Sequence, residues 1–288
     1  MSVLIVASSE PRTGRSLLAA AIAYRMGRAG TPVTLARLAG DDSAAADAAA
    51  FAQLDSIVSP GKPLTAGEVN ALSGDIVLEA PPGSVKVLVE ALGARAVAIG
   101  TATAAAVDAP AAALAGMVVT RVPSSLVSTV DGRAGVLAVL AEDRVLAAPS
   151  VADIAAAVTA QWLVGEGGHA AIDRVMIGTV ASDAASPYFN ARERKCVVTR
   201  FDKTDIQLAA LQTDTECLVI TGGGEPSPYL VDRVRSTRED IAVLVAPGST
   251  VETMRAIEAL YGLSRFDGVG KLNRAVELID AAGFPVAL

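Results

Sequence analysis

The chain has 288 residues, which exceeds the usual size of one domain and predicts two. Its formal net charge of −7 argues against a nucleic-acid partner, because phosphate backbones are held by clustered Lys and Arg. Hydrophobic residues make up 52% of the chain but aromatic residues only 3%, so Ala, Val, Leu and Ile must fill the core. No run of about 18 strongly apolar residues occurs, and we therefore expect no membrane partner.

The N-terminal residues and the cysteines indicate where the protein resides. Val3–Ala7 is expected to form a first strand and not part of a secretion signal, since no basic leader precedes it. Cys196 and Cys217 lie in apolar, strand-like runs, which favours small buried side chains in a reducing compartment over a disulfide. We therefore expect a cytoplasmic protein. The chain has a single histidine, His169, so we expect neither a metal site with several histidine ligands nor a histidine-based catalytic triad. We assign His169 no role.

Short apolar runs alternate with helical stretches in the first half of the chain, a pattern that predicts crossover units and a mainly parallel sheet. After the strand at Val3–Ala7, a helix is expected at Leu17–Met26, ending near Gly27 and Gly30. The further strands expected here are Val33–Leu38, Ile76–Leu78, Ala96–Ile99, Met117–Val119 and one within Gly132–Leu140. Leu146–Ser150 is the expected boundary between domains.

A second alternating series predicts a smaller α/β domain. Its expected strands are Arg174–Gly178, Cys196–Phe201, Cys217–Thr221 and Ile241–Ala246, with helices at 203–212, 226–236 and 250–261. Trp162 is expected to pack from a helix. The predicted domains are residues 1–148, an α/β domain with a P-loop-type sheet, and residues 149–288, which include a C-terminal helix.

The loop SEPRTGRS, from Ser9 to Ser16, lies between the first strand and helix, where backbone N–H groups and the positive helix end favour a phosphate. It matches the P-loop pattern GxxxxGK(S/T) only in part. Gly14 and Ser16 keep the pattern, whereas Ser9 replaces the first glycine and Arg15 replaces the lysine. A planar guanidinium cannot simply take the place of an ammonium that reaches the phosphates. The loop is therefore either a nucleotide or anion site that includes Thr13 to Ser16, or a plain strand-to-helix turn.

Two carboxylates could complete a Mg²⁺ site with Ser16, because that ion takes oxygen ligands. Glu79 ends the strand DIVLE, where parallel sheets present ligand groups. Asp47 begins a helical segment, and its alternative role is that of an acid in the first helical turn. ATP or ADP with Mg²⁺ is the corresponding cofactor prediction.

In the second half, Gly222, Gly223 and Gly224 follow a strand and could form a concave anion site of backbone N–H groups. The alternative is a permissive turn. Asp202 and Asp205 are expected to cap the following helix, and Ser249 or Thr250 the helix after the next strand.

Several segments of the first half resemble the dethiobiotin-synthetase-like P-loop domain found in the N-terminal region of long bacterial phosphotransacetylases and in free-standing relatives. The resemblance rests on the SEPRTGRS loop, VTLARL with Arg37, the helix containing Asp47, DIVLE with Glu79, and the strand Gly116–Pro123. Dethiobiotin synthetases use lysines to guide ATP-dependent ring closure. Because Arg15 and Arg37 stand at both matching positions, that chemistry is not expected here.

The second half resembles the DRTGG domain that accompanies this P-loop domain in those proteins. FDKTDIQLAAL, from Phe201 to Leu211, and CLVITGGG, from Cys217 to Gly224, are similar to the GDRxDIQxAAL and strand-TGG motifs of that family. Phe201 stands in place of Gly and Lys203 in place of Arg. The linker from Glu142 to Asp153 also resembles the family, and together the two resemblances cover nearly the whole chain.

The resemblance implies a regulatory protein that senses a nucleotide or another anionic metabolite in acyl-phosphate or central carbon metabolism. No acetyl transfer is implied, because no acetyltransferase domain is recognised. The residues expected at the ligand are Thr13, Gly14, Arg15, Ser16, Arg37, Gly222 and Gly223, with Ser16, Asp47 and Glu79 at the metal. The alternatives are an ATP-dependent ligase or ATPase of the dethiobiotin synthetase type, and a structural subunit that binds no nucleotide. A homo-oligomer is expected, and a separate metabolic enzyme is a candidate partner.

Overall fold

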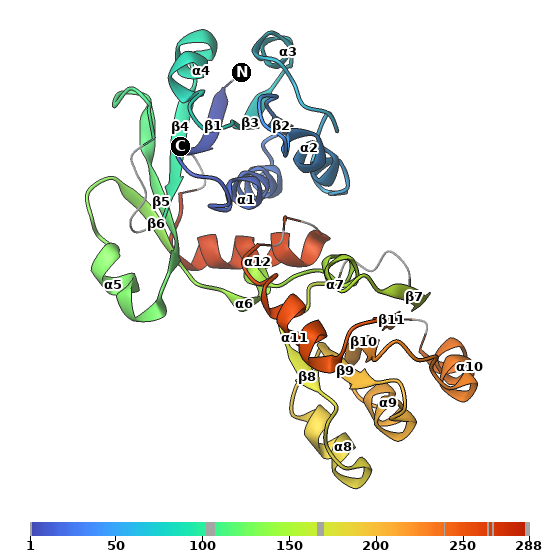
Figure 1. The fold of residues 1–288 in the computed structure, drawn as a ribbon. Helices are drawn as coiled ribbons and strands as arrows, with labels where there is room; N and C mark the ends of the chain where they lie inside the picture. The colour runs from blue at the N-terminus through green and yellow to red at the C-terminus, as the bar shows by residue number, and fades with distance from the viewer. Residues whose placement is uncertain are drawn as a thin grey trace. The chain divides into compact units, whose positions relative to one another are not determined.

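The computed structural model describes residues 2–101, 107–165, 170–238, 240–263, 265–266 and 268–285. His169 lies outside these residues. The chain divides into two compact units, one of residues 1–143 and 266–288 and the other of Arg144–Arg265. Each unit contains its own sheet and helices (Figure 1), and the predicted α/β class is confirmed.

The first unit contains a parallel sheet of six strands in the order β2-β3-β1-β4-β5-β6 within the described residues. The strands are β1 (Val3–Ser8), β2 (Val33–Arg37), β3 (Asp75–Glu79), β4 (Arg95–Gly100), β5 (Leu114–Val122) and β6 (Val136–Ala141). The helices are α1 (Arg15–Arg28), α2 (Ala44–Ala52), α3 (Ala66–Asn70), α4 (Val85–Leu92), α5 (Val127–Val130) and α12 (Gly268–Ala281), with a 3-10 turn at Ser124–Leu126. The order changes direction at β1, which places the β1–α1 loop at the topological switch point of the sheet.

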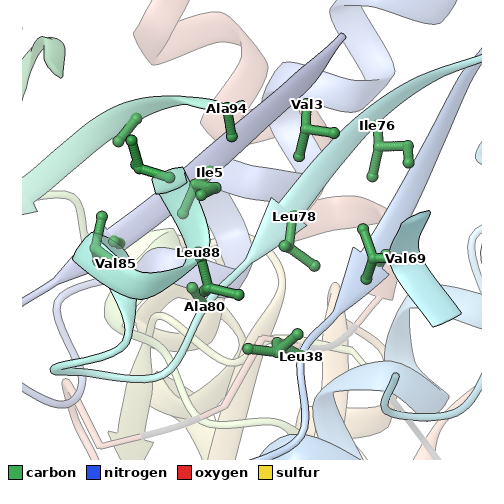
Figure 2. Packing of buried hydrophobic residues seen from close by; sticks show 14 of the residues in the cluster. Val3, Ile5, Leu38, Val69, Ile76, Leu78, Ala80, Val85, Leu88 and Ala94 are labelled. Carbon is green, nitrogen blue, oxygen red and sulfur yellow. The ribbon is translucent and has the colours of Figure 1, made fainter. Parts of the chain in front are cut away.

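Aliphatic side chains fill the core of this unit, as the low aromatic content requires. Figure 2 shows the face on which Ile5, Ile76 and Leu78 from the strands meet Leu88 of α4 and Val69 of α3. Because side chains alternate along a strand, Val6 and Val77 are buried against the other face, where α1 packs on β1, β2 and β3. Both faces of the central strands are therefore covered, as in other parallel sheets.

The C-terminal helix α12 belongs to the first unit, in contrast to the prediction that placed it with residues 149–288. It packs against α1, and Arg25 of α1 forms an ion pair with Asp280 at 2.7 Å between Nε and Oδ1. Arg25 also donates a hydrogen bond to the carbonyl of Phe284 at 3.0 Å. The predicted domains were continuous along the chain, whereas here the chain returns to the first unit after completing the second.

The second unit contains a sheet in the order β7-β11-β10-β9-β8, in which β7 is antiparallel and the other described strands are parallel. The strands are β7 (Gln161–Val164), β8 (Val175–Ile177), β9 (Lys195–Arg200), β10 (Thr215–Thr221) and β11 (Ala242–Val245). The helices are α6 (Arg144–Ala147), α7 (Val151–Ala157), α8 (Ser182–Asn190), α9 (Thr204–Leu211), α10 (Pro228–Thr237) and α11 (Thr250–Glu258). Trp162 lies in the edge strand β7 and not in a helix, so that prediction was wrong.

Two apolar clusters cover the faces of this second sheet. Residues of α8, α9 and α10 pack on one face, and residues of α7 and α11 pack on the other. Cys196 and Cys217 are buried and free, as predicted, and they are register neighbours on β9 and β10. Among the helices that the structure describes, none is sufficiently long and apolar to span a bilayer.

Candidate functional site

The loop between β1 and α1 presents the start of a 14-residue helix without a capping side chain. Gly14 is the N-cap residue, with φ of 92°, and no side chain accepts a hydrogen bond there. Arg12, at φ 58°, is also in the left-handed region. Backbones that alternate in this way form concave groups of N–H donors, and a helix start adds positive partial charge. The loop therefore has the backbone geometry of an anion site.

Hydrogen bonds from neighbouring strands hold this loop in place. Thr120 of β5 donates its hydroxyl to the carbonyl of Thr13 at 3.0 Å, and Ser8 donates to the carbonyl of Glu10 at 2.6 Å. The Thr13 side chain is only 3% exposed, and its hydroxyl oxygen has no hydrogen-bond partner among the described residues. A buried hydroxyl without a partner costs free energy, so the Thr13 hydroxyl would gain from one further hydrogen bond.

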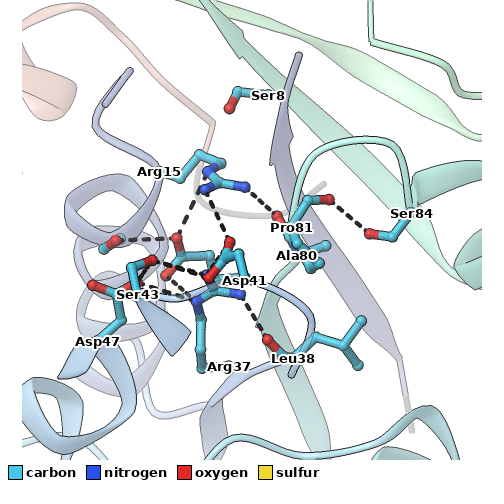
Figure 3. Close-up of polar contacts among 12 residues, drawn as sticks. Ser8, Arg15, Arg37, Leu38, Asp41, Ser43, Asp47, Ala80, Pro81 and Ser84 are labelled. Atoms are coloured by element: carbon cyan, nitrogen blue, oxygen red, sulfur yellow. Dashed lines mark hydrogen bonds and ion pairs between the residues drawn. The ribbon is translucent and has the colours of Figure 1, made fainter. Parts of the chain in front are cut away.

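Arg15 turns toward the ends of the neighbouring strands (Figure 3). It is 8% exposed, and its Nη1 donates to the carbonyl of Ala80 at 2.6 Å. Its guanidinium also lies 3.8 Å from Glu79 and 3.7 Å from Asp41. The positive charge of Arg15 is thus paired with acceptors of the protein itself.

Arg37 is the most enclosed charge of the group. It ends β2 beside Glu79 on β3, where the two residues are register neighbours, and it is 1% exposed. Its Nη2 donates to both carboxylate oxygens of Asp41, at 2.5 and 2.6 Å, and its Nη1 donates to the carbonyl of Leu38 at 2.7 Å. Its Nε lies 3.3 Å from Asp47 and 3.5 Å from Glu79. One guanidinium therefore links three carboxylates, as Figure 3 shows for the labelled residues.

Glu79 is 1% exposed and accepts a hydrogen bond from the Ser16 hydroxyl at 3.0 Å. Burial raises the pKa of Glu79 to about 7, although the charges of Arg37 and Arg15 act in the opposite direction, and the negative charge of Asp47 adds to the rise. For Asp41, burial favours a higher pKa, but the hydrogen bond and charge of Arg37 outweigh it and hold the pKa below its ordinary value. The carboxylates of this site thus differ in how readily they ionise.

We tested whether these residues fit the predicted Mg²⁺ site. Asp47 accepts hydrogen bonds from Ser43 at 2.7 Å and from Arg37 at 3.3 Å, and Glu79 is bonded to Ser16. Asp47 Oδ2 and Glu79 Oε1 are thus already paired with protein donors, whereas the buried Glu79 Oε2 accepts no hydrogen bond from the described residues and lies 3.5 Å from Arg37 Nε. Two guanidiniums lie close to these carboxylates, where a dication would add further positive charge. No group of three His, Cys, Asp or Glu side chains suitable for a metal occurs among the described residues. Ser16, Asp47 and Glu79 therefore do not fit Mg²⁺ in this arrangement.

The structure brings together Arg15, Ser16, Arg37, Asp47 and Glu79, as the sequence analysis expected. Asp41 and Ser43 also belong to this cluster, although no motif in the sequence singled them out. Asp41 follows the carboxyl end of β2 by four residues, the edge at which parallel sheets present ligand groups. This position could have identified Asp41 as a candidate site residue. The nearby Arg37 explains why an acidic residue is placed there, because its guanidinium pairs with the Asp41 carboxylate.

In the second unit, Gly222 and Gly223 lie after β10 with φ of 93° and 67°. Their N–H groups donate to the carbonyls of Gly248 at 2.8 Å and Ala246 at 3.4 Å, so both donors have protein partners. The Phe201 ring lies against the same loop, since a Cβ on Gly224 would be 2.4 Å from it. This geometry is that of a tightly packed turn, and an anion would have to displace these hydrogen bonds.

The turn after β9 is stabilised differently from the prediction. Asp202 pairs with Arg200 at 3.0 Å, and neither Asp202 nor Asp205 caps α9, whose N-cap residue is Lys203. Gln207 instead donates to the carbonyls of Arg200 at 2.7 Å and Phe201 at 3.2 Å from a fully buried position. The predicted Ser249 cap is confirmed, because Ser249 and Glu252 form a capping box at the start of α11.

Comparison with known proteins places one part of the chain. A crystal structure of the CBS and DRTGG domains of the regulatory region of Clostridium perfringens pyrophosphatase, complexed with the activator diadenosine tetraphosphate, is similar at 14% identity and a TM-score of 0.35. The similarity covers 51% of this chain and 62% of that one, so this chain spans less than two thirds of that structure. Residues 153–260, which lie within the second unit, match the DRTGG domain family, and the resemblance inferred from FDKTDIQLAAL and CLVITGGG is confirmed for this part of the chain.

Proposed function

We propose that this protein is a regulatory sensor that binds the phosphate group of an adenine nucleotide, or of another anionic metabolite, at the loop from Thr13 to Ser16. The observation that carries the proposal is the uncapped start of α1 after the left-handed Gly14, beside the buried and unpartnered hydroxyl of Thr13. Helix starts of this kind bind phosphate through backbone N–H groups, which needs no lysine.

The contacts of Arg15 favour binding over phosphoryl transfer. Catalysis of phosphoryl transfer depends on cations that reach the transferred group. Arg15 is held instead by Ala80, Glu79 and Asp41, and Arg37 is enclosed by carboxylates. An ATPase or ligase of the dethiobiotin synthetase type is the second candidate, supported by the position of the loop at the switch point of the sheet.

The regulatory part of the proposal rests on the DRTGG domain at residues 153–260. We propose that the first unit is a dethiobiotin-synthetase-like domain, that the two units together are related to the N-terminal region of phosphotransacetylase, and that they act on a separate metabolic enzyme without acetyl transfer of their own. In this scheme Gly222 and Gly223 contribute through the packing of the second unit, since their N–H groups already have partners.

Calorimetry with ATP, ADP and inorganic phosphate, combined with an assay of phosphate release, tests this function. Gly14→Ala places a Cβ at φ 92°, and Gly30→Ala is a matched control at φ 87°, past the end of α1. Neither new Cβ meets an atom within 4 Å, so each should cost a similar strain of about 1 kcal/mol. We expect saturable binding that Gly14→Ala weakens about tenfold or more and Gly30→Ala leaves unchanged.

The two other functions give different results in the same experiment. Phosphate release that depends on Mg²⁺ and turns over many times would establish the enzyme. Absence of binding at millimolar nucleotide and phosphate, with no change in thermal stability, would contradict the sensor and favour a structural subunit, because a ligand that binds only the folded state must stabilise it.

A further inference from the structure

We infer that the anion site of the first unit takes its ligand without a divalent cation, because Arg15 and Arg37 hold the carboxylates that a cation would need. The inference rests on the proposed function, since it concerns the ligand of the same loop. It specifies the ligand class as a metal-free phosphate group, such as a phosphomonoester or inorganic phosphate, and not a magnesium–nucleotide complex.

The first step is the contact between Ser16 and Glu79. The serine hydroxyl donates directly to Glu79 Oε1 at 3.0 Å. A Mg²⁺ ion bound by both groups would need an octahedral shell at about 2.0–2.1 Å, with several waters. Coordination of the ion by Glu79 Oε1 would therefore compete with this hydrogen bond in a site where Glu79 is 1% exposed. Arg15 Nε, 3.8 Å from the same carboxylate oxygen, would then face the dication.

The second step is the position of Arg37. Its guanidinium donates to both oxygens of Asp41 and lies within 3.3 Å of Asp47. It also donates to the carbonyl of Leu38, and it is only 1% exposed, so it cannot turn out to solvent without breaking these bonds. A guanidinium remains charged at every pH at which proteins are stable. Permanent positive charge is therefore built into the place where a metal would supply it.

The third step concerns what balances the ligand's charge. Two guanidiniums face three carboxylates, Asp41, Asp47 and Glu79, so the cluster carries little net charge of its own. The start of α1 then supplies the attraction for an anion through its partial positive charge and N–H groups. A mono- or dianionic phosphate fits this modest attraction better than a triphosphate, which depends on a metal to neutralise it.

Two measurements on the full chain test the inference. Mn²⁺ is titrated into the protein alone and followed by electron paramagnetic resonance, with Mn²⁺ as the probe for a divalent site. Inorganic phosphate and AMP are titrated by calorimetry in excess EDTA and again in about 5 mM Mg²⁺. We expect no saturable Mn²⁺ binding below about 1 mM, and phosphate or AMP affinities within about twofold in the two buffers.

Arg37→Gln releases Asp41 and Asp47 and is expected to gain Mn²⁺ affinity by about tenfold or more over wild type. Arg15→Gln, at a less enclosed position, releases Glu79 and provides the same test if Arg37→Gln does not fold. Micromolar Mn²⁺ binding by the wild type that Asp47→Asn removes would overturn the inference. Phosphate or AMP binding that is lost in EDTA would also overturn it but leave the proposed function intact, whereas absence of binding in both buffers would overturn the proposed function as well.

Discussion

The buried carboxyl group of Glu79 predicts an unusual dependence of stability on pH. Burial raises its pKa in the folded chain from the ordinary value of 4.5 to about 7. Between these two values the folded chain keeps a proton that the unfolded chain has lost, so stability must fall as the pH rises. One pKa unit corresponds to about 1.36 kcal/mol, which gives a loss of about 2 to 3 kcal/mol between pH 5 and pH 8.

Glu79→Gln removes this titration while keeping an oxygen that accepts from Ser16. We expect the variant to gain about 2 to 3 kcal/mol relative to wild type as the pH rises from 5 to 8. Urea unfolding at four pH values, followed by far-UV circular dichroism, measures this difference.

Glu90→Gln on α4 is the matched control, because this glutamate is exposed and, among the described residues, no ion pair or hydrogen bond joins it to Arg15 or Arg37. Its stability curve should run parallel to that of wild type. The reasoning about Glu79 is refuted if Glu79→Gln also runs parallel to wild type, or if the variant loses stability relative to wild type as the pH rises.

Three further substitutions test other contacts. Arg37→Met should lower the free energy of unfolding by about 3–5 kcal/mol in circular dichroism, since it leaves the buried Glu79 and the half-buried Asp41 and Asp47 without this partner. A loss below about 1 kcal/mol would contradict the network around Arg37. Gly224→Ala should cost about 1–3 kcal/mol in Trp162 fluorescence, because its Cβ would lie 2.4 Å from the Phe201 ring. Adding Phe201→Ala should then cost less in that background than in wild type, and additive costs would argue against the contact. Gln207→Ala should cost about 1–3 kcal/mol, since it removes a fully buried side chain that donates to the carbonyls of Arg200 and Phe201, and a neutral result would assign the turn to other contacts.

Most elements of both sheets could be predicted from the sequence because each is a short apolar run between glycine- or proline-containing turns. DIVLE and CLVIT read as buried strands from their residues alone. The edge strand β7 was missed, because its half-exposed residues lack the continuous apolar pattern of the central strands. The place of α12 was missed for a different reason, since helical periodicity indicates an apolar face but not the helix on which it packs.

The candidate site was predicted as a set of positions but not as an arrangement. Arg15 was expected at the ligand from the P-loop pattern and Arg37 from the family resemblance, whereas Glu79 was expected there because it ends a strand of a parallel sheet. Which way each guanidinium turns depends on acceptors that are distant in sequence, such as the carbonyl of Ala80. Asp41 could be assigned as the partner of Arg37 only once the orientation of the Arg37 guanidinium was known, because a buried guanidinium requires a nearby anion.

On the proposed function, arginine at positions 15 and 37, where a dethiobiotin-synthetase-like domain has lysine, favours binding over catalysis. A lysine ammonium at position 15 could move between the loop and a bound phosphate, because it is compact and its stem is flexible. A guanidinium has five donors in a fixed plane, and at position 15 one of them is bonded to Ala80 while the group lies near two carboxylates. The Arg15 guanidinium therefore stabilises the strand ends in one geometry. It cannot move toward a bound phosphate, as a cation in phosphoryl transfer must, without breaking these contacts. The backbone N–H groups of the loop do not depend on that side chain, so the proposed function expects anion binding without phosphoryl transfer.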